Sequence, residues 1–112
     1  KKTQLLTKKN KKITVNLAIN YGSKNEIMQS IKKIKKKINI KNFEKNLYTN
    51  SIPNPEILIR TGGHQRLSNF MLWQLAYAEL FFLKKLWPDF TANDLIKIIN
   101  NYKKSKRNFG GI

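Results

Sequence analysis

The chain has 112 residues, 40% of them hydrophobic, and 23 Lys and Arg against 6 Asp and Glu give it a formal net charge of +17. That length suits one domain with a hydrophobic core, and the apolar content argues against intrinsic disorder. The absence of cysteine excludes disulfides and thiolate metal sites and fits a reducing compartment, so we expect a cytoplasmic protein. No segment approaches the roughly 18 consecutive apolar residues of a transmembrane helix, so we expect no membrane span.

The first half of the chain predicts one strand followed by helices. Residues 13–19 (ITVNLAI) form a β-branched apolar run that predicts a strand leading into the loop at residues 20–23. Apolar side chains then recur at helical spacing and predict an amphipathic helix with lysines on its other faces: Ile27, Ile31, Ile34 and Ile38. Residues 39–55 are polar and irregular, and we expect a short helix near residues 43–47 followed by a loop.

The second half predicts two more strands and two more helices. Residues 57–59 (ILI) are continuously apolar, which is typical of a strand covered on both faces in a parallel sheet. Residues 70–83 are apolar on all sides and predict a buried helix that runs into a strand. Thr91 and Asp94 have capping-box spacing at the start of a last helix. Its expected buried stripe is Leu95, Ile98, Ile99 and Tyr102, and its expected end is Gly110-Gly111. Strands alternating with helices predict an α/β fold with a parallel sheet, in the order strand-helix-strand-helix-strand-helix.

Two of the chain's three arginines lie close together in residues 60–70, which read RTGGHQRLSNF. A guanidinium binds phosphate or carboxylate oxygens two at a time, whereas lysine is a flexible point charge. Arg60 follows a predicted buried strand, and ligands of open parallel sheets bind beyond the carboxyl ends of strands. Arg60, Arg66 and the Ser68 hydroxyl therefore predict an anion clamp, and we expect glycine amides of the turn to contribute. The alternative is an arginine-rich turn that pairs with local carboxylates.

Glu79 is the single charged residue within the apolar residues 70–83. A buried carboxylate is costly unless it is paired, hydrogen-bonded or bound to a metal. One interpretation is a salt bridge to an arginine. The other is a ligand of Mg²⁺ beside phosphates, because this ion takes one or two carboxylates together with phosphate oxygens.

The remaining charged groups give weaker signals. His64, the lone histidine, is expected to be exposed in its glycine-rich turn, and a catalytic or metal-binding role is the alternative. The charge of +17 makes a nucleic-acid-binding protein an alternative, but Lys, Asn and Ile are all over-represented, and we favour a solvated lysine face without nucleic acid.

Three segments together show a recognisable pattern: residues 60–90 (RTGGHQRLSNFMLWQLAYAELFFLKKLWPDF), residues 13–27 (ITVNLAINYGSKNEI) and residues 106–111 (KRNFGG). They resemble segments of the cis-prenyltransferases, the isoprenyl transferases that include undecaprenyl diphosphate synthase. The resemblance extends over essentially the whole chain and corresponds to the C-terminal half of a full-length member, so residues 1–112 are expected to be the C-terminal part of a single domain.

The resemblance implies an enzyme that condenses isopentenyl diphosphate with an allylic diphosphate in repeated cis additions, with Mg²⁺ as cofactor. Arg60, Arg66 and Ser68 match the positions that hold the isopentenyl diphosphate, Leu67 lies in the same segment, and Glu79 matches the carboxylate that assists magnesium binding. The family also implies a homodimer, a lipid carrier for cell-wall synthesis as product, and peripheral membrane contact through that lipid.

The chain departs from the family pattern in ways that limit its expected activity. His64 stands where the family usually has Glu, and Asn108 replaces the arginine of the Arg-x-Gly tail, for which Arg107 is a candidate substitute. The family's Asp-Gly-Asn loop, which carries the essential magnesium aspartate, has no counterpart. We therefore expect no catalytic residue in this chain and no prenyl transfer by it alone. A non-catalytic partner subunit is the alternative.

Overall fold

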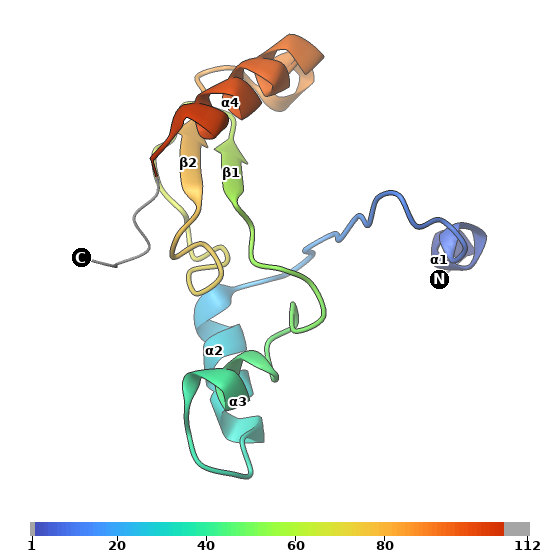
Figure 1. Cartoon of the computed structure of the whole chain (residues 1–112), viewed down its shortest axis with the longest axis vertical. Helices are drawn as coiled ribbons and strands as arrows, with labels where there is room; N and C mark the ends of the chain where they lie inside the picture. The colour runs from blue at the N-terminus through green and yellow to red at the C-terminus, as the bar shows by residue number, and fades with distance from the viewer. Residues whose placement is uncertain (1, 107–112) are drawn as a thin grey trace.

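The computed structural model describes residues 2–106, so the predicted helix end at residues 110–111 and the tail residues Arg107 and Asn108 lie outside the described part. Figure 1 shows a short parallel sheet in the middle of the molecule, with helices at both of its ends. The elements in chain order are helix α1 (Lys2–Thr7), helix α2 (Ser23–Lys33), helix α3 (Ile40–Glu44), strand β1 (Ile57–Arg60), strand β2 (Glu79–Phe82), the 3₁₀ turn η1 (Trp87–Asp89) and helix α4 (Ala92–Lys104).

The predicted α/β class with a parallel sheet is confirmed. β1 and β2 pair in parallel, with Ile57 opposite Glu79 and Arg60 opposite Phe82. Both strands are apolar except at one end, but none of their residues is buried and Leu80 is 43% exposed, so the predicted cover on two faces is not present in the described residues. Both arrowheads point toward α4, so the carboxyl ends of the strands lie at that end of the sheet (Figure 1).

The predicted first strand, residues 13–19, is wrong for this structure. The segment has no regular secondary structure, and Ile13, Val15, Leu17 and Ile19 are 79%, 76%, 81% and 84% exposed. It belongs to the long connection that leads from α1 to α2 in Figure 1. A strand exists only when its amides and carbonyls pair with a neighbour, and none of the described residues pairs with this segment.

The predicted helix before β2 is also wrong, because residues 70–77 form a series of turns. The Leu75 amide donates to the Met71 carbonyl at 2.9 Å, whereas the Ala76 and Ala78 amides donate to carbonyls three residues earlier. Asn69 and Met71 have φ of 63° and 46°. These left-handed values interrupt a right-handed helix at its start. The predicted strand that follows is confirmed as β2.

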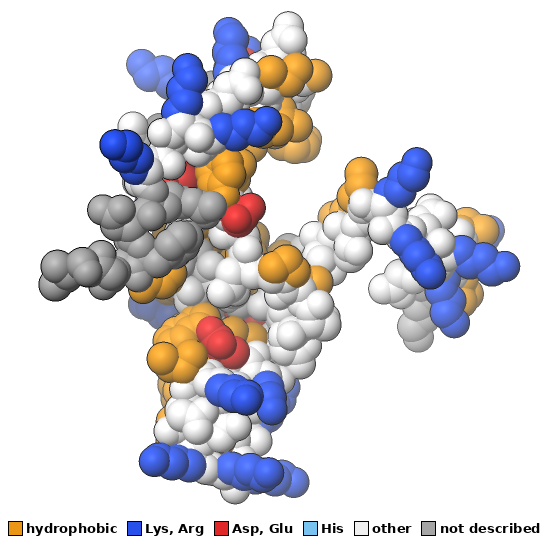
Figure 2. Space-filling view, in the orientation of Figure 1, with side chains coloured by type: hydrophobic (Ala, Val, Ile, Leu, Met, Phe, Trp, Pro, Cys, Tyr) orange, Lys and Arg blue, Asp and Glu red, His pale blue; other side chains and the backbone are white. Residues whose placement is uncertain are grey.

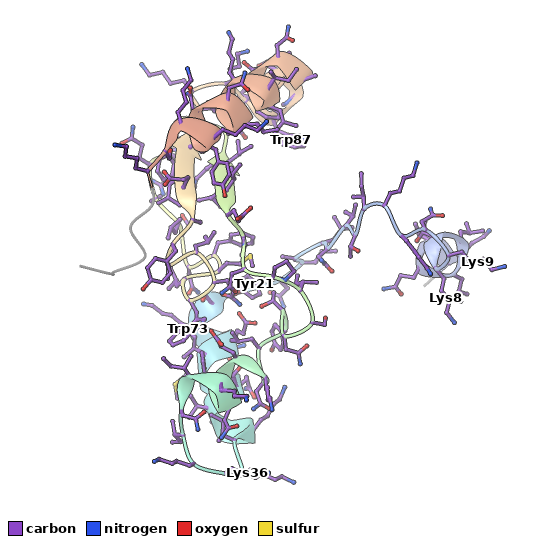
Figure 3. The ribbon with its side chains drawn as sticks, in the orientation of Figure 1. Lys8, Lys9, Tyr21, Lys36, Trp73 and Trp87 are labelled. Carbon is purple, nitrogen blue, oxygen red and sulfur yellow. The ribbon has the colours of Figure 1, made fainter. Side chains whose placement is uncertain are left out.

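Helices α2 and α3 pack together below the sheet. The predicted helix at residues 27–38 begins earlier and ends at Lys33, and α3 covers Ile40–Glu44 instead of residues 43–47. Phe43 and Leu47 are buried there, and the Phe43 ring meets the Trp73 indole edge to face with centroids 4.6 Å apart. Figure 3 shows Trp73 beside these helices and Lys36 at the far end of the same body.

Helix α4 begins with the predicted capping box. The Thr91 hydroxyl accepts from the Asp94 amide at 3.3 Å, and the Asp94 carboxylate accepts from the Thr91 amide at 2.9 Å. Lys85 forms a salt bridge to Asp94 at 2.8 Å. The hydrogen bond from Lys85, followed by those from Thr91, holds the pKa of Asp94 well below its usual range. Within the predicted stripe, Ile98 is buried while Leu95 is 40% exposed.

The hydrophobic core of the described residues is small. Its buried apolar side chains are Phe43, Leu47, Leu75 and Ile98. The radius of gyration is 16.5 Å, against about 13 Å for a compact domain of similar length. Figure 2 shows lysines and arginines over α4, over α1 and at the far end of the α2 and α3 body. Helices within residues 2–106 fall short of the length and hydropathy that crossing a bilayer requires.

Candidate functional site

Arg60 is the last residue of β1, so its side chain leaves the sheet at the carboxyl end of the strand. One guanidinium nitrogen, Nη1, donates to the Arg66 carbonyl oxygen and to the Ser68 hydroxyl oxygen, the latter at 3.0 Å. These bonds close the loop at residues 60–68 on itself. They leave the other nitrogens of the Arg60 fork and the hydroxyl hydrogen of Ser68 for a ligand.

The predicted clamp residues line one common hollow of about 300 Å³. Its lining consists of Leu58, Ile59, Arg60, Arg66, Leu67, Ser68 and Phe70. Arg66 is exposed, and Ser68 adopts a left-handed backbone with φ of 50°. A non-glycine residue in this region is strained, and such strain concentrates at binding sites. The structure therefore brings Arg60, Arg66, Leu67 and Ser68 together, with two cations and a hydroxyl suited to an anion.

The expectation that glycine amides face an anion is wrong. The Gly62 amide donates to the Lys85 carbonyl at 2.7 Å, and the Gly63 amide donates to the Leu83 carbonyl at 2.8 Å. Both glycines have positive φ, 90° and 76°, which lets the turn reach back to the chain after β2. These amides are used to hold the turn against β2, so the anion-binding groups are side chains. His64 in this turn is exposed, as predicted.

Glu79 lies apart from the clamp. It opens β2 opposite Ile57, three positions before the pair formed by Phe82 and Arg60. At about 3.3 Å per residue, this separation is about 10 Å along the strand. Alternation of side chains along paired strands also places Glu79 and Arg60 on opposite faces of the sheet.

The surroundings of Glu79 do not make a magnesium site. Within residues 2–106, Glu79 forms no salt bridge to Arg60 or Arg66, and no group of three potential metal-binding side chains occurs. Mg²⁺ demands octahedral oxygen coordination, and a single carboxylate supplies one or two of those oxygens. The described residues therefore do not fit a resident magnesium ion by themselves.

Sequence reasoning missed a buried polar cluster around Glu26, which is 0% exposed. Its carboxylate accepts from the Tyr21 hydroxyl at 2.5 Å, from the Tyr48 amide at 2.8 Å and from Gln74 Nε2 at 3.1 Å. Burial, followed by the hydrogen bond to Glu26, raises the pKa of Tyr21. Gln74 also donates to the Thr49 hydroxyl at 3.1 Å. Figure 3 labels Tyr21 where the chain enters α2.

The one signal for this cluster was the scarcity of acids. Glu26 lies in the first turn of α2, where the helix dipole already favours an acidic residue, so its position in the sequence gives no sign of its burial. Nothing in the spacing of residues 20–30 predicts contacts with residues 48 and 74, because those contacts join segments far apart in the chain.

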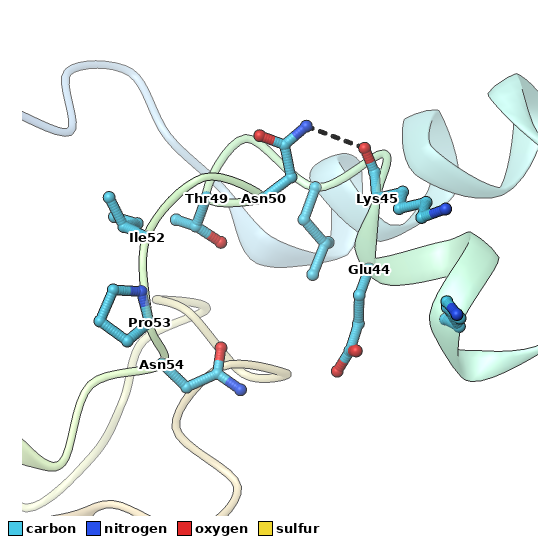
Figure 4. Close-up of a pocket in the computed structure, with 9 residues that line it drawn as sticks. Glu44, Lys45, Thr49, Asn50, Ile52, Pro53 and Asn54 are labelled. Carbon is cyan, nitrogen blue, oxygen red and sulfur yellow. Dashed lines mark hydrogen bonds between the residues drawn. The ribbon is translucent and has the colours of Figure 1, made fainter.

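A second hollow, of about 360 Å³, lies between α3 and the loop that follows it (Figure 4). Lys45, Glu44, Thr49 and Asn50 are among its lining residues, and the Asn50 side chain donates to the Lys45 carbonyl at 2.9 Å. The Glu44 carboxylate accepts from the Trp73 indole at 3.2 Å. None of the predicted clamp residues lines this hollow, so it is separate from the candidate site.

Comparisons with known proteins agree on one family. The family model for undecaprenyl diphosphate synthase matches residues 1–110. An isoprenyl transferase of Fusobacterium nucleatum is 46% identical over 110 residues, which are 95% of this chain and 47% of that protein. An isoprenyl transferase of Rickettsia felis is 49% identical over 109 residues, which are 94% of this chain and 46% of that protein.

Solved structures show the same similarity. A probable undecaprenyl diphosphate synthase from Campylobacter jejuni superimposes with a TM-score of 0.88 at 35% identity, over 96% of this chain and 52% of that one. Lavandulyl diphosphate synthase from Lavandula x intermedia, in complex with dimethylallyl diphosphate, superimposes with a TM-score of 0.90 at 36% identity, over 98% of this chain and 52% of that one. The chain thus spans about half the length of the relatives it matches.

Proposed function

The chain belongs to the undecaprenyl diphosphate synthase family, and on that basis we propose that it forms part of an isoprenyl transferase. The enzyme would condense isopentenyl diphosphate with an allylic diphosphate in repeated cis additions and release a long polyprenyl diphosphate. Residues 1–112 would be the C-terminal part of its single domain and would hold isopentenyl diphosphate. We also propose that this enzyme is a cytoplasmic homodimer that contacts the membrane peripherally through its lipid product.

The observation that carries this proposal is the shared hollow at the carboxyl end of β1. Arg60 and Arg66 supply two permanent positive charges there, and Ser68 supplies a hydroxyl. A diphosphate presents oxygens at the spacing that a guanidinium fork binds in pairs. Leu67 and Phe70 give the same hollow apolar walls, which suit the short hydrocarbon part of isopentenyl diphosphate.

We propose that this chain binds one substrate without transforming it. Prenyl transfer requires a group that helps the allylic diphosphate leave, and in this family a magnesium aspartate of the Asp-Gly-Asn loop has that role. The chain has 6 acidic residues, and Glu26 and Glu44 are engaged as hydrogen-bond acceptors within the fold. A magnesium ion shared with Glu79 would need further oxygen ligands from outside residues 2–106, so we derive no catalytic step from it.

Calorimetric titration tests the proposed site, with isopentenyl diphosphate and inorganic pyrophosphate as ligands. We expect Arg60→Ala to weaken binding at least about tenfold, because a hydrogen bond to a charged group contributes about 1.5–3 kcal/mol and 1.4 kcal/mol is tenfold in affinity. Arg60→Lys keeps the positive charge but loses the guanidinium fork, so its affinity should lie between that of the wild-type chain and that of Arg60→Ala. Lys97→Ala, an exposed cation of α4, is the matched control.

Unchanged binding by Arg60→Ala would refute the proposed site. Repeating the titration with Mg²⁺ tests the role of Glu79, since any gain in affinity that depends on magnesium should disappear in Glu79→Gln. The alternative of nucleic-acid binding predicts instead a duplex-DNA affinity that falls steeply with salt and is insensitive to Arg60.

A further inference from the structure

Asn69 connects the clamp loop to the amino end of α2. Its carbonyl oxygen accepts from the Ser23 amide at 2.8 Å, and its side-chain oxygen Oδ1 accepts from the Lys24 amide at 2.9 Å. The first amides of a helix have no partners within the helix, and α2 has no side-chain cap from its own N-cap residue. Asn69 thus caps α2 from a position 45 residues later in the chain.

The connection is reciprocal and closely packed. The Ser23 hydroxyl, which is fully buried, accepts from the Leu72 amide at 2.9 Å. A methyl group on Gly22 would lie 3.0 Å from the Asn69 side-chain nitrogen, so only a glycine leaves Asn69 undisturbed. The Tyr21 and Phe70 rings meet edge to face with centroids 5.6 Å apart. Residues 21–24 and 69–72 are therefore joined at several points.

The same segment sets the conformation of the clamp. Ser68 and Asn69 both have left-handed φ, 50° and 63°. Asn tolerates this region better than most residues, but for Ser it is strained and must be imposed by the surroundings. Because Asn69 is fixed on α2, the preceding Ser68 hydroxyl is held 3.0 Å from the Arg60 guanidinium.

The Glu26 cluster gives α2 a rigid base for this connection. Glu26 lies one turn beyond Ser23, and its three hydrogen bonds attach α2 to Tyr21, Tyr48 and Gln74. Gln74 is 2% exposed and follows the clamp segment in sequence. The chain that follows Ser68 is thus attached to α2 at Asn69, at Leu72 and at Gln74.

We propose that Asn69 is a positioning residue, which fixes the clamp loop to the amino end of α2 and thereby presents Ser68 and Arg66 to the diphosphate together with Arg60. This inference rests on the proposed function and adds a residue that touches no ligand. Asn69 acts through its side-chain cap on α2 and through its tolerance of the left-handed backbone.

The test compares Asn69 with a cap of the same kind elsewhere. Inorganic pyrophosphate is titrated into the wild-type chain and into Asn69→Ala, Asn69→Gly and Gly22→Ala, with Thr91→Ala as the control because Thr91 caps α4 away from the clamp. Either cap loss should lower thermal stability similarly, by the usual cost of a helix cap. We expect Asn69→Ala to weaken pyrophosphate binding about tenfold and Thr91→Ala to leave it within about twofold.

The other variants separate folding from positioning. Asn69→Gly keeps the left-handed backbone and the carbonyl bond, so it should recover part of the affinity lost in Asn69→Ala. Gly22→Ala displaces the Asn69 side chain by a few tenths of an ångström without changing Asn69 itself, and it should also weaken binding. If Asn69→Ala does not fold, as judged by circular dichroism, the Gly22→Ala and Asn69→Gly affinities decide.

Each result assigns the failure to one proposal. Wild-type affinity in Asn69→Ala or Gly22→Ala, alongside weak binding by Arg60→Ala, would overturn the role of Asn69 and leave the diphosphate site intact. An equal loss in Thr91→Ala, or no recovery in Asn69→Gly, would also overturn it. If the wild-type chain does not bind pyrophosphate, or Arg60→Ala binds it normally, the proposed function itself fails.

Discussion

Removal of the Glu26 carboxylate should destabilise the chain strongly. In Glu26→Ala, three donors lose their acceptor: the Tyr21 hydroxyl, the Tyr48 amide and the Gln74 amide group. A buried donor left without a partner costs about 1–3 kcal/mol; the Gln74 donor is buried and the other two are partly buried, so the three together give about 3 kcal/mol, the low end of that range for each. The cavity left by the side chain adds to this loss, and relief from burying an acid subtracts from it.

Glu26→Gln is the matched variant because it preserves the shape of the side chain. Its amide oxygen can still accept from the Tyr48 amide, and its amide nitrogen can donate to Gln74 Oε1, a buried atom without a hydrogen-bond partner among the described residues. We therefore expect Glu26→Gln to lose less than half as much stability as Glu26→Ala.

Urea unfolding followed by tryptophan fluorescence measures both changes, because Trp73 lies next to Gln74 in the chain and contacts α3 through Glu44. The midpoints should decrease in the order wild type, Glu26→Gln, Glu26→Ala, at similar m-values. A loss below about 1 kcal/mol in Glu26→Ala would refute the reasoning, since it would mean that these donors find water or other partners.

Two further predictions concern α4 and catalysis. The Asp94 pKa is lowered in the folded state, so the stability from its bonds to Lys85 and Thr91 should be complete above the ordinary pKa near 3.8 and should fall as the pH drops below that value. Asp94→Asn should therefore reduce the loss of helix signal in circular dichroism as the pH is lowered. An unchanged acid loss in this variant would contradict the assignment. With Mg²⁺, isopentenyl diphosphate and an allylic diphosphate, the isolated chain should form no elongated product in a radiolabelled extraction assay, and chain-length growth above background would disprove its proposed inactivity.

Local patterns in the sequence predicted the elements that depend on neighbours in the chain. The capping box depends only on Thr91 and Asp94, which are three residues apart in the sequence. The apolar triplet before Arg60 likewise defines a strand and its end. The grouping of Arg60 with Ser68 followed from the same local logic, because eight residues and a glycine turn separate them. These predictions needed no knowledge of distant partners.

The missed features depend on contacts between distant segments. Residues 13–19 have the composition of a strand, but strand formation requires a neighbour that composition does not supply. The caps that Asn69 provides to Ser23 and Lys24 bridge more than forty residues, and no spacing rule predicts them. Glu79 was expected beside the clamp from its apolar surroundings in the sequence and from the family resemblance, whereas the strand register places it at the opposite end of β2.

The exposed apolar side chains of residues 13–19 also affect how separate molecules of this chain behave toward one another. A segment with exposed, alternating Ile, Val and Leu side chains and no strand partner among the described residues is a template for pairing between molecules. Lysines immediately before it, Lys8, Lys9, Lys11 and Lys12, act as gatekeepers that repel other copies at low ionic strength. Because the Debye length shrinks from about 10 Å at 0.1 M salt to about 3 Å at 1 M, this protection is electrostatic and weakens as salt is added. We therefore expect the colloidal stability of the chain to depend on these lysines, which do not take part in the proposed chemistry.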